Sequence, residues 1–93
     1  MPVSIHVEPN GPGRYGVTVD DGNGRSTHTV SLSPDYYEKL THKRVPAEKL
    51  IEHSFRFLLE HESKESILRQ FDLPLIGHYF PGYETEIRRR LAD

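Results

Sequence analysis

The sequence predicts an α+β fold, in which a three-stranded antiparallel meander within residues 1–33 precedes about four helices within residues 34–93. Three observations carry this prediction. Apolar and polar residues alternate in the first third of the chain, the pairs Asp-Gly and Asn-Gly in DDGNG mark a hairpin turn, and apolar residues recur at helical spacing after Pro46. A chain of 93 residues is long enough for one core and too short for two. We therefore expect a single α+β domain over residues 1–93.

Three segments alternate with the period of two that is typical of half-buried strands: VSIHV, RYGVTVD and STHTVSL. Short glycine-rich connections separate them, so neighbouring segments are expected to pair as antiparallel strands. The residues expected on the buried face are Val3, Ile5, Val7, Tyr15, Val17, Val19, His28, Val30 and Leu32.

The helical half begins at residues 33–35, where a serine cap, a proline and an aspartate favour a helix start. This first helix is expected to end near residues 40–42. Pro46 opens a longer helix whose apolar arc is wide enough to contact both the sheet and other helices. A short helix capped by Ser63 and a last helix after Pro81 complete the prediction.

Composition excludes several classes of function. Lys and Arg number 12 against 14 Asp and Glu, for a net charge of -2, which argues against nucleic acid as a partner because such binding depends on phosphate neutralisation. The absence of cysteine excludes disulfides, thiolate catalysis and cysteine-ligated metals. No secretory signal or apolar membrane span is present, so we expect a cytoplasmic protein without membrane contact.

Known catalytic and cofactor motifs are also missing from the sequence. Six histidines occur, but His53 and His61 lie eight residues apart, and neither H-E-x-x-H nor a glycine-rich phosphate loop is present. We therefore expect no metal, no cofactor and no enzymatic activity. An enzyme with a His and Glu site within residues 53–62 is the least favoured alternative.

One stretch suggests a DNA-binding function. THTVSLSPDYYEKL, followed by VPAEKLIEHSFRFLLEH, resembles the ribbon-helix-helix family of bacterial repressors and antitoxins over residues 27–61. In that family, a strand of alternating small polar and aliphatic residues precedes a Pro-Asp helix start. The resemblance implies that Thr27, Thr29 and Ser31 face the DNA major groove, paired with the same strand of a second protomer. The competing interpretation is an ordinary meander strand that leads into a helix.

A second stretch, FDLPLIGHYFPGYETEI at residues 71–87, is dense in aromatic residues. Together with the residues just before it, this stretch reads ESILRQFDL followed by YFPGYE. That sequence resembles small uncharacterised bacterial proteins of about this length, a resemblance that implies no activity. These aromatic side chains either close the core or form a partner-binding surface, since Tyr and Phe are enriched at protein interfaces. The predicted partner-binding residues are Phe71, Tyr79, Phe80 and Tyr83.

The leading prediction is a small, non-enzymatic bacterial protein that acts by macromolecular interaction with an unknown protein partner. Its small core also leaves room for a homodimer. The alternative prediction is a DNA-binding antitoxin or repressor of ribbon-helix-helix type.

Overall fold

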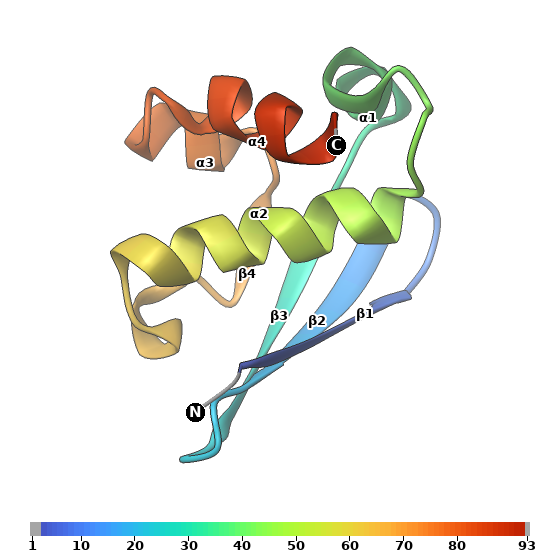
Figure 1. Cartoon of the computed structure of the whole chain (residues 1–93). Coiled ribbons are helices and arrows are strands. Elements are labelled where there is room, and N and C mark those ends of the chain that lie inside the picture. Colours follow the sequence, from blue (N-terminus) through green and yellow to red (C-terminus); the bar gives the residue numbers. More distant parts are fainter. Residues whose placement is uncertain (1–2, 93) are drawn as a thin grey trace.

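The computed structural model describes residues 3–92, which form an α+β fold with one four-stranded sheet of order β1-β2-β3-β4 (Figure 1). The strands are β1 (Ser4–Pro9), β2 (Arg14–Asp20), β3 (Arg25–Ser31) and β4 (Gln70–Asp72). The helices are α1 (Pro34–Thr41), α2 (Ala47–His61), α3 (Leu75–Tyr79) and α4 (Tyr83–Leu91), with one 3-10 turn, η1 (Lys64–Ser66).

The predicted meander is confirmed, but the prediction of three strands is wrong. The strands β1, β2 and β3 pair antiparallel, whereas β4 pairs parallel with β3 and places Phe71 opposite Val30. A parallel neighbour needs a crossover connection, which α1 and α2 supply. Only three residues form β4, too few for an alternating pattern to be visible in the sequence. The short helix expected after Ser63 is the single 3-10 turn η1.

The hairpin between β2 and β3 is stabilised by its own aspartates. The side chain of Asp20 accepts a hydrogen bond from the backbone N–H of Gly22 at 2.9 Å, and Asp21 accepts one from Asn23 at 2.9 Å. These bonds are typical of Asx turns, in which the side chain mimics a backbone turn. The turn therefore fixes the register that directs alternate residues of both strands into the core.

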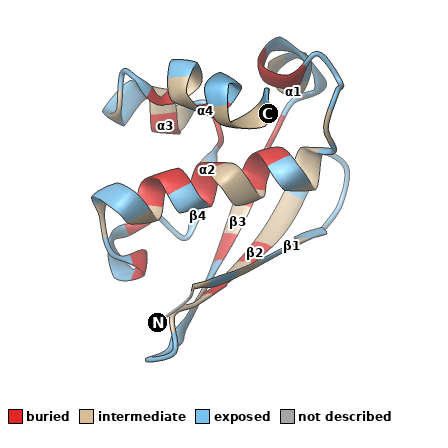
Figure 2. Ribbon diagram, in the orientation of Figure 1, coloured by how far each residue is buried: buried red, intermediate tan, exposed pale blue. Residues whose placement is uncertain are grey.

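Helix α2 is the central element of the core. It lies between one face of the sheet and α4, and Figure 2 shows buried residues along both α2 and the central strands. This position explains its broad apolar arc, as predicted. The buried residues of α2 are Leu50, Ile51, Ser54, Phe55, Phe57 and Leu58.

A network of ion pairs joins α4 to α2. Glu86 accepts hydrogen bonds from Arg89 and Arg90, and Arg90 also donates to Glu60 of α2 at 2.7 Å. The adjacent guanidinium groups lower the pKa of Glu86 to about 2. Hydrogen bonds from ionised groups to a carboxylate stabilise its charged form, so the network depends on Glu86 being ionised.

The network predicts a defined acid dependence of stability. Because the pKa of Glu86 lies below its ordinary value of 4.5, its contribution is complete above about pH 4.5 and is lost as the pH falls towards about 2. We expect the variant Glu86→Gln to lose less stability than the wild type over that interval. Thermal unfolding followed by circular dichroism measures the difference, with the exposed position Glu38→Gln as control. Parallel curves for wild type and Glu86→Gln contradict the assignment.

Candidate functional site

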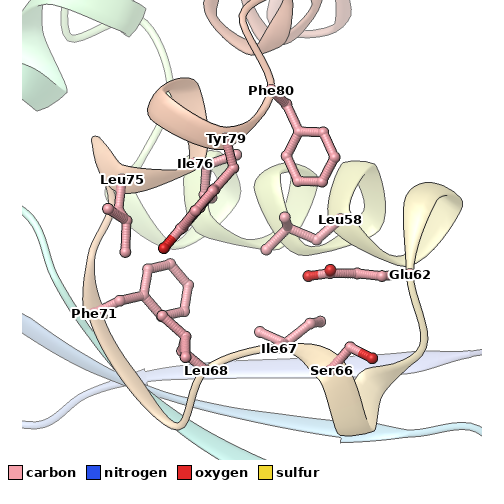
Figure 3. A pocket seen from close by; sticks show the side chains of 10 residues that line it. All are labelled: Leu58, Glu62, Ser66, Ile67, Leu68, Phe71, Leu75, Ile76, Tyr79 and Phe80. Atoms are coloured by element: carbon pink, nitrogen blue, oxygen red, sulfur yellow. The ribbon is translucent and has the colours of Figure 1, made fainter.

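A groove of about 420 Å³ opens between the carboxyl end of α2, the segment from η1 to β4, and α3 (Figure 3). Its walls are mainly apolar, and its volume lies within the range that binding sites commonly have. The main lining residues are Leu58 and Glu62 from α2, Ile67, Leu68 and Phe71 from the η1–β4 segment, and Leu75, Tyr79 and Phe80 from the α3 segment.

Helix α3 and the residue that ends it form one wall of the groove, to which Leu75, Ile76, Tyr79 and Phe80 all contribute. Ile76 is buried and Phe80 packs partly on the core, where its ring stacks on His61 at a centroid distance of 5.0 Å and meets Phe57 edge-on at 5.8 Å. Leu75 and Tyr79, one helical turn apart, are less buried than Ile76 and line the outer part of this wall. Packing of Ile76 and Phe80 therefore holds Tyr79 at the rim.

Buried His28 holds the opposite wall in place. Its Nδ1 lies 2.8 Å from the carbonyl oxygen of Leu68, and its Nε2 lies 2.8 Å from the hydroxyl of Ser26. A carbonyl oxygen only accepts hydrogen bonds, so Nδ1 donates to Leu68, and in the neutral ring Nε2 accepts from Ser26. The ring of His28 also packs on Phe55, which packs in turn on Phe71 of the groove. The strand β3 thus supports the segment that carries Leu68.

A buried lysine also fixes the η1–β4 segment, which forms one wall of the groove. Lys64 in η1 is only 7% exposed, and its Nζ donates to Asp21 at 2.8 Å and to Glu65 at 2.5 Å. The carboxylates of Asp21 and Glu65 raise the pKa of Lys64, which keeps it charged. This contact joins η1 to the hairpin between β2 and β3. The wall that the η1–β4 segment forms is therefore attached to the sheet at two points, through Lys64 and through His28.

The rim of the groove exposes apolar surface. Within residues 3–92, the large hydrophobic side chains that remain exposed are Leu68, at 50%, and Tyr79, at 64%. Both line this groove. Single exposed apolar residues are ordinary, but two that lie on either side of Phe71 along one apolar groove form a patch of the kind found at interaction sites.

The structure brings three of the four predicted partner-binding residues together. Phe71, Tyr79 and Phe80 all line the groove, Phe71 from β4 of the sheet and the other two from α3 and the residue that ends it. Tyr83 does not belong to this surface, because it is fully buried and its hydroxyl lies 2.6 Å from that of buried Ser54. Burial raises the pKa of Tyr83. The prediction that Tyr83 belongs to the partner-binding surface is therefore wrong, because its side chain lies in the core.

The residues implied by the ribbon-helix-helix resemblance lie on a strand inside the sheet. Thr29 and Ser31 belong to the part of β3 that pairs with β2 on one side and with β4 on the other. Thr27 pairs with Thr18 of β2. A ribbon shared by two protomers needs a free strand edge, and over residues 29–31 that edge is occupied by β4.

The part of the chain that the structure describes contains neither a cluster of metal ligands nor a helix that could span a membrane. Residues 3–92 bring together no three His, Asp or Glu side chains that could hold a metal ion. His61 stacks on Phe80, while burial lowers the pKa of His53. No helix among these residues combines the length and apolar character needed to cross a bilayer.

Sequence reasoning missed Leu68 and Glu62 as members of the site. Leu68 belongs to a stretch that was predicted to be helical, and an isolated leucine there carries no signal of exposure. The sequence gives no sign that Glu62 belongs to a partner-binding surface, but it is the residue that ends α2, and its carboxylate points into the groove (Figure 3). The parallel pairing of β4 is what brings Phe71 and Leu68 to this edge.

Comparisons of the chain with models of protein families, with curated proteins and with solved structures find no match.

Proposed function

We propose that this is a small, non-enzymatic protein that acts by binding another protein through the groove between α2, β4 and α3. The observation that carries the proposal is that the exposed large hydrophobic side chains of residues 3–92, Leu68 and Tyr79, both lie at the rim of one apolar groove. Burying both of them against a partner removes apolar surface from water and so favours association.

Features of the groove fit a protein partner. Burial and hydrogen bonds of His28 and Lys64 and burial of Ile76 hold in place the elements that form its walls. A preformed site loses little conformational entropy on binding. Aromatic anchors such as Tyr79 and Phe71 are the residue types that carry most binding energy at protein interfaces.

Photo-cross-linking tests the proposal. A benzophenone-bearing residue in place of Leu68 is expected to give a discrete covalent adduct in the cells that naturally make the protein. The substitution Tyr79→Ser is expected to reduce that adduct more than about tenfold, because it removes an interface anchor. Since Tyr79 is 64% exposed, its loss should change the free energy of unfolding by no more than about 0.5 kcal/mol. An undiminished adduct in a folded Tyr79→Ser variant contradicts the proposal.

DNA binding of ribbon-helix-helix type remains the alternative proposal, but no observation favours it. The hydroxyls of Thr29 and Ser31 lie on the sheet face that α2 does not cover, beside the carboxylate of Asp72. A carboxylate repels the phosphates whose neutralisation supplies most of the affinity for DNA.

A further inference from the structure

The strand β4 has an unpaired edge beside the groove. The parallel ladder attaches β4 to β3, and two further backbone hydrogen bonds flank it: the carbonyl of Arg69 accepts one from Thr29 at 2.7 Å, and the N–H of Leu73 donates one to Ser31 at 2.9 Å. Bonding groups alternate between the two sides of a strand, so Gln70 and Asp72 direct their N–H and C=O groups away from β3. Since β4 is the last strand in the sheet order of residues 3–92, these groups form a free edge.

The groove lies along this edge on the helical side of the sheet. Phe71 of β4 contributes its side chain to the groove, between Leu68 on one side and Tyr79 on the other (Figure 3). A strand added to the edge lies about 4.8 Å from β4, and its alternate side chains point to the same side as Phe71. Those alternate side chains would therefore enter the groove.

One acidic side chain is directed into this otherwise apolar space. The carboxylate of Glu62 points from the end of α2 towards the space between Leu58 and Ile67 (Figure 3). Glu62 is half-buried, and within residues 3–92 its carboxylate has no ion pair or hydrogen bond to a side chain or backbone donor. A half-buried carboxylate is stabilised by a cationic partner, and such a pair contributes specificity to a complex.

We infer that the groove binds an extended segment of a partner protein, which joins the free edge of β4 as a fifth strand and places a Lys or Arg against Glu62 between apolar residues. This inference rests on the proposed function. Backbone hydrogen bonds to Gln70 and Asp72 supply part of the affinity, and the alternate side chains in the groove supply the specificity. In the bound segment, apolar residues two positions away from that Lys or Arg contact Phe71 and Tyr79 of the groove.

A second copy of this chain fits the site less well. Closed two-fold pairing of β4 with its own copy is antiparallel, and the basic residue next to that strand, Arg69, lies immediately before its start. Glu62 lies beside Ile67, near the same end of the strand (Figure 3). Antiparallel pairing brings the second Arg69 to the opposite end of β4, where Glu62 cannot reach it.

A displayed library of random heptapeptides, selected on the folded chain, tests the inference. The selected peptides are expected to carry Lys or Arg with Leu, Ile, Val or Phe two residues away. For a synthetic peptide of that sequence, Glu62→Gln is expected to raise the Kd about tenfold, because it removes the charge of the pair. The matched control is Glu48→Gln on the same helix, outside the groove, which should leave the Kd unchanged.

The outcomes separate the inference from the proposed function. Peptides that lose affinity with Tyr79→Ser but not with Glu62→Gln overturn the inference and leave the groove as the binding surface. Selected peptides without a basic residue, or a chain that sediments as a dimer through β4, also overturn it. Peptides whose Kd responds to neither Glu62→Gln nor Tyr79→Ser contradict both proposals. Circular dichroism of each variant establishes that a loss of affinity does not come from unfolding.

Discussion

Replacing Phe55 by alanine is expected to lower the free energy of unfolding by about 3–5 kcal/mol, the cost of deleting a fully buried phenylalanine ring. Phe55 is 0% exposed, and its ring lies 5.4 Å from that of His28 and 6.0 Å from that of Phe71. It therefore connects α2 to β3 and to β4. Small domains have total stabilities of about 5–15 kcal/mol, so this single loss is a large share of the whole.

Urea unfolding measures this effect, with the adjacent residue as its control. Arg56 is exposed and pairs with Glu52 on the surface of α2, so Arg56→Ala should change the free energy of unfolding by less than about 0.5 kcal/mol. A loss below about 1 kcal/mol for Phe55→Ala would show that this position does not join the sheet to the helices. That result would also show that Phe55 does not hold Phe71 in place.

The second large effect concerns the buried hydroxyl pair between α2 and α4. Ser54 donates to the carbonyl of Leu50 at 2.8 Å, so the hydroxyl of Tyr83 donates to Ser54 at 2.6 Å. Ser54→Ala leaves the buried hydroxyl of Tyr83 without its acceptor. We expect a loss of about 1–3 kcal/mol in the free energy of unfolding, the usual cost of an unsatisfied buried polar group.

A double-mutant cycle isolates this hydrogen bond. The variant Ser54→Ala with Tyr83→Phe removes both hydroxyls, so it should be more stable than Ser54→Ala alone. Urea unfolding of the wild type, both single variants and the double variant gives the coupling energy. Additive losses, with the double variant the least stable of the four, contradict the pairing of Ser54 with Tyr83.

Much of the fold follows from local pattern in the sequence. Alternation identifies the three strands of the meander, and the buried positions Val17, Val19 and Val30 confirm its inward face. The start of α1 at Pro34 follows from the serine cap, whose hydroxyl accepts the N–H of Tyr36 at 3.1 Å. These features depend on neighbours in the chain, which is why sequence reasoning finds them.

The groove could be predicted only in part, because tertiary packing decides which side chains of residues 58–80 are buried and which line the groove. The aromatic density of residues 71–87 identifies one wall, but not which of its side chains are exposed. Tyr83 and Tyr79 look equivalent in the sequence, yet Tyr83 is buried by α2 while Tyr79 is at the rim. The strand β4 is only three residues long and pairs with β3, which lies far from it in the sequence, so local pattern does not identify it.

The most direct test compares photo-cross-linking from Leu68 with cross-linking from Thr27 in the cells that naturally make the protein. Leu68 marks the groove, and Thr27 is exposed on β3, outside the groove residues. Binding through the groove predicts a discrete protein adduct from the probe at Leu68 and none from the probe at Thr27. An adduct that forms only from Thr27, whether with protein or with DNA, would contradict the assignment of the groove as the binding surface.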